Sequence, residues 1–238
     1  MASIKDAMEE AFTDNLSFIK YVVFTVPLYY CVYLFTSSKG DLTGFWWMAS
    51  VTFLLLFGFF IKCTANVRNG LDHVLPSFNI FNLFWAGIKG VVALGPSIAI
   101  NSWLASLLSG LVDTHIPDPN FALGFKIVIW AIFVSIMLTG YMQYSKNFKI
   151  ADAYNFKTIS NSCIDILIRV LFMVPIVLII DAIIVGAITY VFWVFLGIPN
   201  PICTYFWCMA FVFNLAMIGN YMAQIDYETI EAKSERDI

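Results

Sequence analysis

The chain contains few charged residues. Of its 238 residues, only 12% are Asp, Glu, Lys or Arg, whereas 61% are hydrophobic. A soluble globular domain has roughly 25% charged and about 45–50% apolar residues. This shortage of charge excludes an ordinary water-soluble domain and indicates that lipid is the main solvent. The net charge of −3 is small, and no basic patch with interleaved aromatic residues occurs, so no nucleic-acid partner is expected.

Residues that commonly carry catalysis or bind metals are also scarce. Histidine occurs only twice, as His73 and His115. The sequence has no GxSxG, HExxH or phosphate-binding loop. Asp113, His115 and Asp118 could be drawn as a metal site, but they lack the spacing of a Cys/His site. We therefore expect a protein that is not an enzyme and holds no metal or cofactor, although an enzyme that uses carboxylates alone stays open.

Cysteine is used sparingly and without the CxxC spacing of redox or zinc motifs. The five cysteines are Cys31, Cys63, Cys163, Cys203 and Cys208. Free cysteines usually serve as small apolar packing residues. Cys31 and Cys203 fall near the same predicted side of the membrane and could form a disulfide, but nothing in the spacing requires one.

What the sequence does contain is long apolar runs. About 20 mainly apolar residues are needed to cross the hydrocarbon as a helix, and in lipid the backbone must satisfy its own hydrogen bonds. We predict an all-α, polytopic membrane protein with six transmembrane helices, forming a single integral membrane domain over residues 1–238. The predicted crossings are Leu16–Phe35, Phe45–Ile61, Lys89–Val112, Phe121–Tyr144, Ile164–Leu196 and Ile202–Met222. We do not expect the charged segment before them to be a signal peptide. Tryptophans such as Trp46 and Trp207 are expected to mark the membrane interfaces.

One pattern occurs three times along the chain. In Ile19–Pro27, Ile88–Pro96 and Ile168–Pro175, a basic residue opens an apolar helix and a proline follows about two turns later. The second apolar run of each unit ends with a glycine before a polar stretch; these glycines are Gly58, Gly140 and Gly219. The pattern predicts three helical hairpin repeats and a charged tail, approximately 1–70, 71–147, 148–226 and 227–238. An axis along the membrane normal would relate such repeats, but a six-helix bundle without this symmetry stays open.

The three prolines should bend their helices. Pro27, Pro96 and Pro175 each remove one backbone donor inside a predicted crossing, and kinks in helices are usually found at proline. Because the positions match, we expect the first helices of the three hairpins to bend alike.

The basic residues predict the orientation. All 13 lysines and arginines except Lys39 and Lys126 fall on the side that holds both termini. Short loops rich in Lys and Arg stay in the cytoplasm. We therefore expect a multi-pass protein of the cell (inner) membrane with cytoplasmic N- and C-termini.

Three amphipathic segments precede the hairpins. Ile4–Phe12 and Phe81–Ile88 place apolar residues along one helical stripe, and Phe148–Ile159 does so more loosely. Such helices can lie in the headgroup region and brace each hairpin, or they can dock a cytoplasmic partner. The acidic face formed by Asp6, Glu9 and Glu10 fits anionic lipid poorly, which keeps docking open for the first segment.

Asp181 is the strongest single candidate for a functional residue. It lies within an apolar run, where a carboxyl group costs about 2.5–3.5 kcal/mol on insertion scales and is usually turned away from lipid. Asn101 occupies a comparable place after Pro96, and Asn214 lies in the last predicted helix. Together these residues could form a polar centre that binds a small solute or passes a proton, or they could only hold helices together. Lys126 is an ion partner for Asp181 only if helix tilt matches their depths.

Three stretches resemble an uncharacterised family of integral membrane proteins, number 4013 among the domains of unknown function. The similar stretches are Asp6–Asp14, Val67–Lys89 and Ala151–Ile159. There is also a distant likeness to the membrane region of some glycerophosphodiester phosphodiesterases. The resemblance implies a helical membrane fold, but no agreed activity and no catalytic residues. Because the soluble phosphodiesterase domain is absent from this sequence, we do not expect that activity.

Two functions fit these observations. The first is a non-enzymatic scaffold or accessory subunit of a membrane complex, which acts through its cytoplasmic surface helices. The alternative is a transporter or channel for a small solute or lipid, with a polar centre around Asp181. Membrane lipids and a cytoplasmic or membrane protein are the expected partners, and a homo-oligomer could also form.

Overall fold

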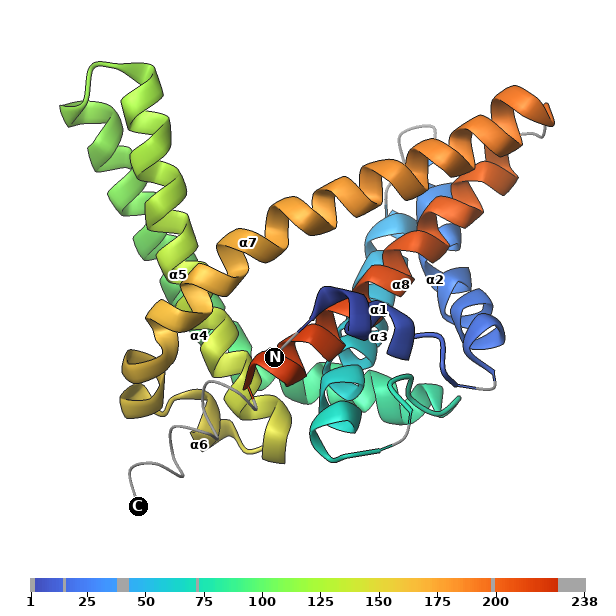
Figure 1. Cartoon of the computed structure of the whole chain (residues 1–238), viewed down its shortest axis with the longest axis horizontal. Coiled ribbons are helices and arrows are strands. Elements are labelled where there is room, and N and C mark those ends of the chain that lie inside the picture. Colours follow the sequence, from blue (N-terminus) through green and yellow to red (C-terminus); the bar gives the residue numbers. More distant parts are fainter. Residues whose placement is uncertain (1–2, 15, 38–42, 72, 198–199, 227–238) are drawn as a thin grey trace. The chain divides into compact units, whose positions relative to one another are not determined.

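The part of the chain that the structure describes consists of helices joined by turns and irregular segments. This computed structural model describes residues 3–14, 16–37, 43–71, 73–197 and 200–226, and within these ranges it has no β-strand. The elements are α1 (Ile4–Glu10), α2 (Ser17–Ser37), α3 (Thr43–Arg68), α4 (Ile80–His115), α5 (Pro119–Asn147), α6 (Ile150–Ala153), α7 (Phe156–Ile188), the π-helix η1 (Thr189–Phe195) and α8 (Asn200–Asp226) (Figure 1). The all-α prediction is confirmed for these residues.

Six helical stretches are long and apolar enough to cross a membrane. Their most apolar windows have mean hydropathies between 1.6 and 2.8, and each stretch overlaps one of the six predicted crossings. They are Ser17–Ser37, Thr43–Arg68, Ile80–His115, Pro119–Asn147, Phe156–Phe195 and Asn200–Ile225. By length and composition, the described residues thus form a multi-pass helical membrane protein.

The chain divides into two compact units, which we describe separately. Unit 1 comprises Met1–Lys89 and Pro175–Gln224, and unit 2 comprises Gly90–Val174 and Ile225–Ile238. Helix α4 passes from unit 1 into unit 2 after Lys89, and α7 returns to unit 1 at Pro175. The division leaves the predicted repeat boundaries untested.

In unit 1, aromatic contacts join α2, α3, α8 and the segment that follows α1. The rings of Phe24 and Phe59 lie 5.0 Å apart between α2 and α3, and both side chains are fully buried. Phe12 stacks on Phe213 of α8 at 4.9 Å. The hydroxyl of Tyr205 donates to the carbonyl of Val22 over 2.7 Å, which ties α8 to α2.

In unit 2, α5 runs back along the second half of α4 after a short turn, as the green ribbons of Figure 1 show. Asp118 caps α5 by accepting hydrogen bonds from the N–H groups of Asn120 and Phe121. The hydroxyl of Tyr154 donates over 2.8 Å to the carbonyl of Ala93. This carbonyl lies next to the one that Pro96 deprives of its helical donor.

The three glycines of the repeated pattern all lie where segments approach closely. A Cβ atom at Gly58 would collide with the carbonyl of Leu83 at the start of α4. At Gly140 it would meet the carbonyl of Ala153 in α6 at 2.9 Å, and at Gly219 the carbonyl of Phe60 in α3 at 3.2 Å. Only glycine permits the first of these contacts without moving a backbone.

The predicted surface helices differ in how they fold. The first is a separate helix, α1, and ends at Glu10. The second is not separate: residues 81–88 are the opening turns of α4, because Asn79 caps the helix by accepting from the N–H of Asn82 and no breaker follows. The third is interrupted: Phe148 adopts a left-handed conformation (φ 55°), α6 has four residues, and Asn155 then caps the start of α7.

Pro27, Pro96 and Pro175 lie inside α2, α4 and α7, as the sequence predicts. The hydroxyl of Thr52 on α3 donates to the carbonyl of Pro27 over 3.3 Å. The bends themselves stay a prediction. The fifth crossing holds a feature that the sequence did not predict, because its last turns form the π-helix η1.

Candidate functional site

Asp181 and Asn214 lie side by side in unit 1. Asp181 is on α7 and is partly exposed, whereas Asn214 on α8 is 7% exposed. The side-chain N–H of Asn214 donates to a carboxyl oxygen of Asp181. The structure therefore brings together two of the three residues of the predicted polar centre.

The Asn214 amide is only half satisfied. Its Oδ1 atom is buried and has no hydrogen-bond partner among the described residues. An unpaired buried polar atom costs about 1–3 kcal/mol. This oxygen could accept from a bound water or from an amine or hydroxyl of a solute.

Asn101 belongs to unit 2, and its side-chain N–H group bonds within its own helix. The side-chain N–H donates to the carbonyl of Ser97 over 2.8 Å and to the hydroxyl of Ser97 over 3.2 Å. Its participation in a centre with Asp181 stays a prediction. Lys126 forms its ion pair with Asp113, near the turn between α4 and α5.

His115 and Asp118, two residues of the cluster that could be drawn as a metal site, bond to residues close to them in the sequence. The ring nitrogen Nδ1 of His115 is 2.9 Å from the carbonyl of Leu111 and 2.8 Å from the hydroxyl of Thr114, and Asp118 caps α5. Among the described residues, no group of three His, Cys, Asp or Glu side chains is placed to hold a metal ion. Cys31 and Cys203 are both buried free thiols.

A polar network that the sequence analysis missed joins the two ends of the chain. The side-chain N–H of Asn220 on α8 donates to the carbonyl of Ala7 over 3.2 Å and to the carboxylate of Glu10 over 2.8 Å. Gln224 accepts from the backbone N–H of Ser3 over 3.0 Å and donates to Asn220 over 3.4 Å. The only available signal was the spacing of two amides one helical turn apart, at the polar end of the last crossing.

The network leaves one face of α1 free. Lys5, Asp6 and Glu9 are exposed. Lys5 and Glu9 approach each other to 3.7 Å with 77% and 63% of their side chains exposed, and such a surface pair contributes little to stability. Glu10 is exposed as well, but one oxygen of its carboxylate already accepts a hydrogen bond from Asn220.

Lys20, one of the basic residues from which the cytoplasmic side is predicted, is buried at the start of α2. It is 7% exposed, pairs with Asp14, and donates to the carbonyl of Leu75 over 3.4 Å. Burial by itself raises the pKa of the Asp14 carboxyl, but hydrogen bonds from Lys20 and from the N–H of Leu16, with the charges of Lys20 and His73, hold that pKa below its ordinary value.

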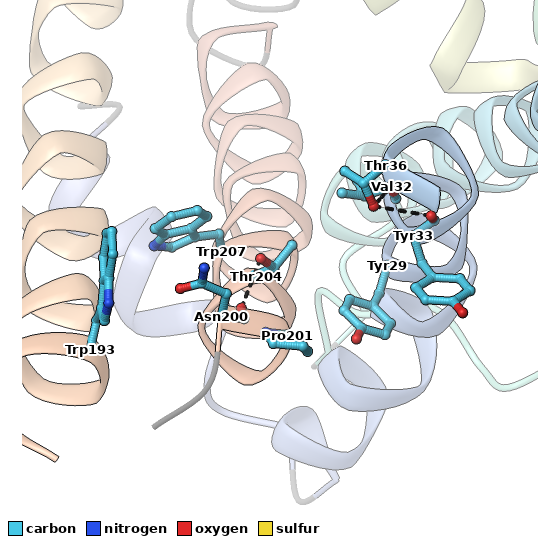
Figure 2. Close-up of a pocket in the computed structure, with 9 residues that line it drawn as sticks. All are labelled: Tyr29, Val32, Tyr33, Thr36, Trp193, Asn200, Pro201, Thr204 and Trp207. Carbon is cyan, nitrogen blue, oxygen red and sulfur yellow. Dashed lines mark hydrogen bonds between the residues drawn. The ribbon is translucent and has the colours of Figure 1, made fainter. Parts of the chain in front are cut away.

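Pockets lined by described residues also occur in unit 1, and two of them bear on function. The first has a volume of about 410 Å³ and lies at the ends of α2, η1 and α8 that the charge distribution predicts to face away from the cytoplasm (Figure 2). Its lining consists of Tyr29, Val32, Tyr33, Thr36, Trp193, Asn200, Pro201, Thr204 and Trp207. We call it the aromatic pocket.

The second pocket, of about 350 Å³, is an apolar groove between α2, α3 and α8. It is lined by Leu28, Cys31, Ala49, Thr52, Phe53, Leu56, Phe57, Phe60, Phe211 and Leu215. Asp181 lines neither of these two pockets.

The fold and these sites define the class of the protein: an all-helical protein, in the part of the chain described, with six helices suited to crossing a membrane. Comparisons with protein families, with curated proteins and with solved structures found no match to this chain. Its function is therefore argued from its own residues.

Proposed function

We propose that this chain is a non-enzymatic scaffold or accessory subunit of a membrane complex, with cytoplasmic N- and C-termini in the cell (inner) membrane. The observation that carries the proposal is the attachment of α1 to the end of α8. The seven residues of α1 are too few for a stable isolated helix. The Asn220 and Gln224 amides supply the missing stabilisation by bonding to its backbone and to Glu10.

The attachment gives α1 a fixed exposed face. Asp6 and Glu9 lie on that face, and neither takes part in the network with α8. A preorganised surface binds a partner at a lower entropic cost than a mobile one. The proposed partner is therefore a protein that presents basic side chains to this acidic face.

Charge reversal tests the docking face. In Asp6→Lys/Glu9→Lys, like charges would oppose the basic partner, which costs several kcal/mol. We expect the double variant to recover about tenfold less of the partner from native membranes than the unaltered chain does. The matched control is Lys5→Glu on the same helix, which should recover at least as much as the unaltered chain. Equal recovery by all three proteins would count against docking through α1.

We also propose that the chain consists of three copies of a hairpin with a surface segment. A recurrent contact supports this. The second helix of the first hairpin meets the next surface segment through Gly58, and that of the second hairpin does so through Gly140. The corresponding helix of the third hairpin, α8, meets α1 through Asn220. Each contact lies within one unit.

A second candidate function is proton-linked transport, and the pair of Asp181 and Asn214 favours it. Ionisable side chains within membrane helices often mark solute paths or proton relays, and Asp181 lies in an apolar helix next to an amide with an unpaired oxygen. In proteoliposomes with an internal pH-sensitive dye, this function predicts proton uptake that Asp181→Asn abolishes and Glu9→Gln leaves unchanged. Uptake equal to that of protein-free vesicles, or uptake retained by Asp181→Asn, would remove this candidate.

A further inference from the structure

The aromatic pocket is rich in polar groups that have no protein partner. Among the described residues, the hydroxyls of Tyr29 and Tyr33, the side-chain amide of Asn200 and the indole N–H groups of Trp193 and Trp207 make no hydrogen bond. The hydroxyls of the two threonines are used within their own helices; that of Thr204, for example, donates to the carbonyl of Asn200. Tyr33 and Trp193 are 52% and 55% exposed and Asn200 is exposed as well, so these donors are open to a ligand.

Trp207 makes the strongest case for a ligand. Its Nε1 atom is buried and unpaired, so bulk water does not satisfy it as it would satisfy an indole in an ordinary interfacial belt. Figure 2 shows the two tryptophans on one side of the first turn of α8 and the two tyrosines on the other. Asn200 and Thr204 lie between them in this view.

The chemistry of the lining favours an anionic oxygen ligand. Indole, phenol and amide N–H or O–H groups all donate hydrogen bonds, and none of the nine lining residues carries a charge. Hydrogen bonds to an ionised acceptor are roughly twice as strong as neutral ones. The start of α8 adds the positive end of a helix dipole, and the aromatic rings offer apolar surface for carbon atoms next to the anion.

The position of the pocket limits the kinds of ligand that could reach it. Tyr29 and Tyr33 lie in the last turns of α2, Trp193 lies in η1 and Asn200 begins α8, so all come from helix ends that should reach one headgroup layer. π-Helical turns are frequent at functional sites. We propose that the aromatic pocket binds the phosphodiester headgroup of a membrane lipid. This inference rests on the membrane assignment but is independent of docking by α1.

The test uses the full chain purified in detergent and titrated with phosphatidylglycerol or with diacylglycerol, with bound lipid counted by native mass spectrometry. We expect phosphatidylglycerol to bind at least tenfold more tightly than diacylglycerol. Trp207→Phe keeps the ring and loses the N–H, and Asn200→Ala loses the amide. Each should weaken phosphatidylglycerol binding by about tenfold, as expected for one hydrogen bond to a charged group.

Trp46→Phe is the matched control, because Trp46 is 63% exposed at the start of α3 and should face the same headgroup layer. It should leave binding unchanged. Equal binding of the two lipids, or equal losses in Trp46→Phe and Trp207→Phe, would overturn the proposal and leave an interfacial belt. Displacement of the lipid by equimolar inorganic phosphate would support the phosphate chemistry and identify a soluble source.

If Trp207→Phe does not fold, Tyr33→Phe tests the same pocket from α2. Circular dichroism establishes folding for each variant before titration. The docking experiment changes residues of α1 only and measures recovery of a partner protein. The lipid experiment changes residues of the aromatic pocket and counts bound lipid. A negative result in one experiment therefore does not affect the other proposal.

Discussion

The two ends of α8 use their polar side chains in opposite ways. Toward its C-terminus, Asn220 is fully buried and its amide bonds to three other residues. At its N-terminus, Asn200 and Trp207 have no partners among the described residues. Asn214 lies between them with one bonded and one unpaired group. The comparison indicates that the C-terminal end builds the structure, while the N-terminal end is available to a ligand.

The largest effect on stability is expected when the hydrogen bonds of Asn220, at the C-terminal end of α8, are removed. Asn220→Leu would remove the hydrogen bonds that the fully buried Asn220 amide donates to the carbonyl of Ala7 and to the carboxylate of Glu10, and the one that it accepts from Gln224. A hydrogen bond between neutral groups contributes about 0.5–1.5 kcal/mol and one to a charged group about 1.5–3 kcal/mol. We expect a clear fall in the thermal unfolding temperature in detergent and faster proteolysis within α1.

The control for this prediction is Asn200→Leu, at the other end of the same helix. It removes an amide of the same size that has no protein partner, so the unfolding temperature should stay nearly constant. If both leucine variants lose the same stability, the contrast between the two ends is wrong.

The sequence did not predict the hydrogen bonds at the C-terminal end of α8. The six crossings follow from the length and composition of apolar runs, and the close approaches of Gly58 and Gly140 lie at positions that the repeat marked. The bond between Asn220 and Ala7 joins residues 213 positions apart, and no local pattern encodes such a pairing.

The second surface helix was mispredicted because amphipathic spacing does not show where a helix ends. Residues 81–88 have the expected stripe but continue into α4. The sequence predicts Trp207 in an interfacial belt, and only the three-dimensional structure shows that its N–H is buried and unpaired. Asp181 and Asn214 were found by sequence because charge and amides are conspicuous in apolar runs.

Acidification should reduce the stability of unit 1 by a smaller amount, through the ion pair between Asp14 and Lys20. The folded-state pKa of Asp14 is held below its ordinary value, which is about 3.9 in the unfolded chain. Its pairing with Lys20 therefore stabilises the fold above that pH, and this contribution is lost as the pH falls from there through the folded-state pKa.

Hydrogen exchange measures this loss directly. Exchange in residues 16–20 should quicken below about pH 4, the ordinary range of an aspartate, beyond the change in intrinsic rate. In Asp14→Asn, the same segment should exchange quickly already at neutral pH and lack the acid step. An unchanged acid step in the variant would assign it to another carboxylate.

The smallest change in stability is expected for Trp207→Phe, and the sign of this change is informative. Without lipid, Trp207→Phe removes a buried donor that lacks a partner, so the free protein should be as stable as the unaltered chain or slightly more stable. With phosphatidylglycerol, the unaltered chain should gain unfolding temperature as the ligand binds the folded state, and the variant should gain less. If Trp207→Phe instead destabilises the lipid-free protein as much as Asn220→Leu does, the indole N–H has an internal structural role, and the two ends of α8 are alike.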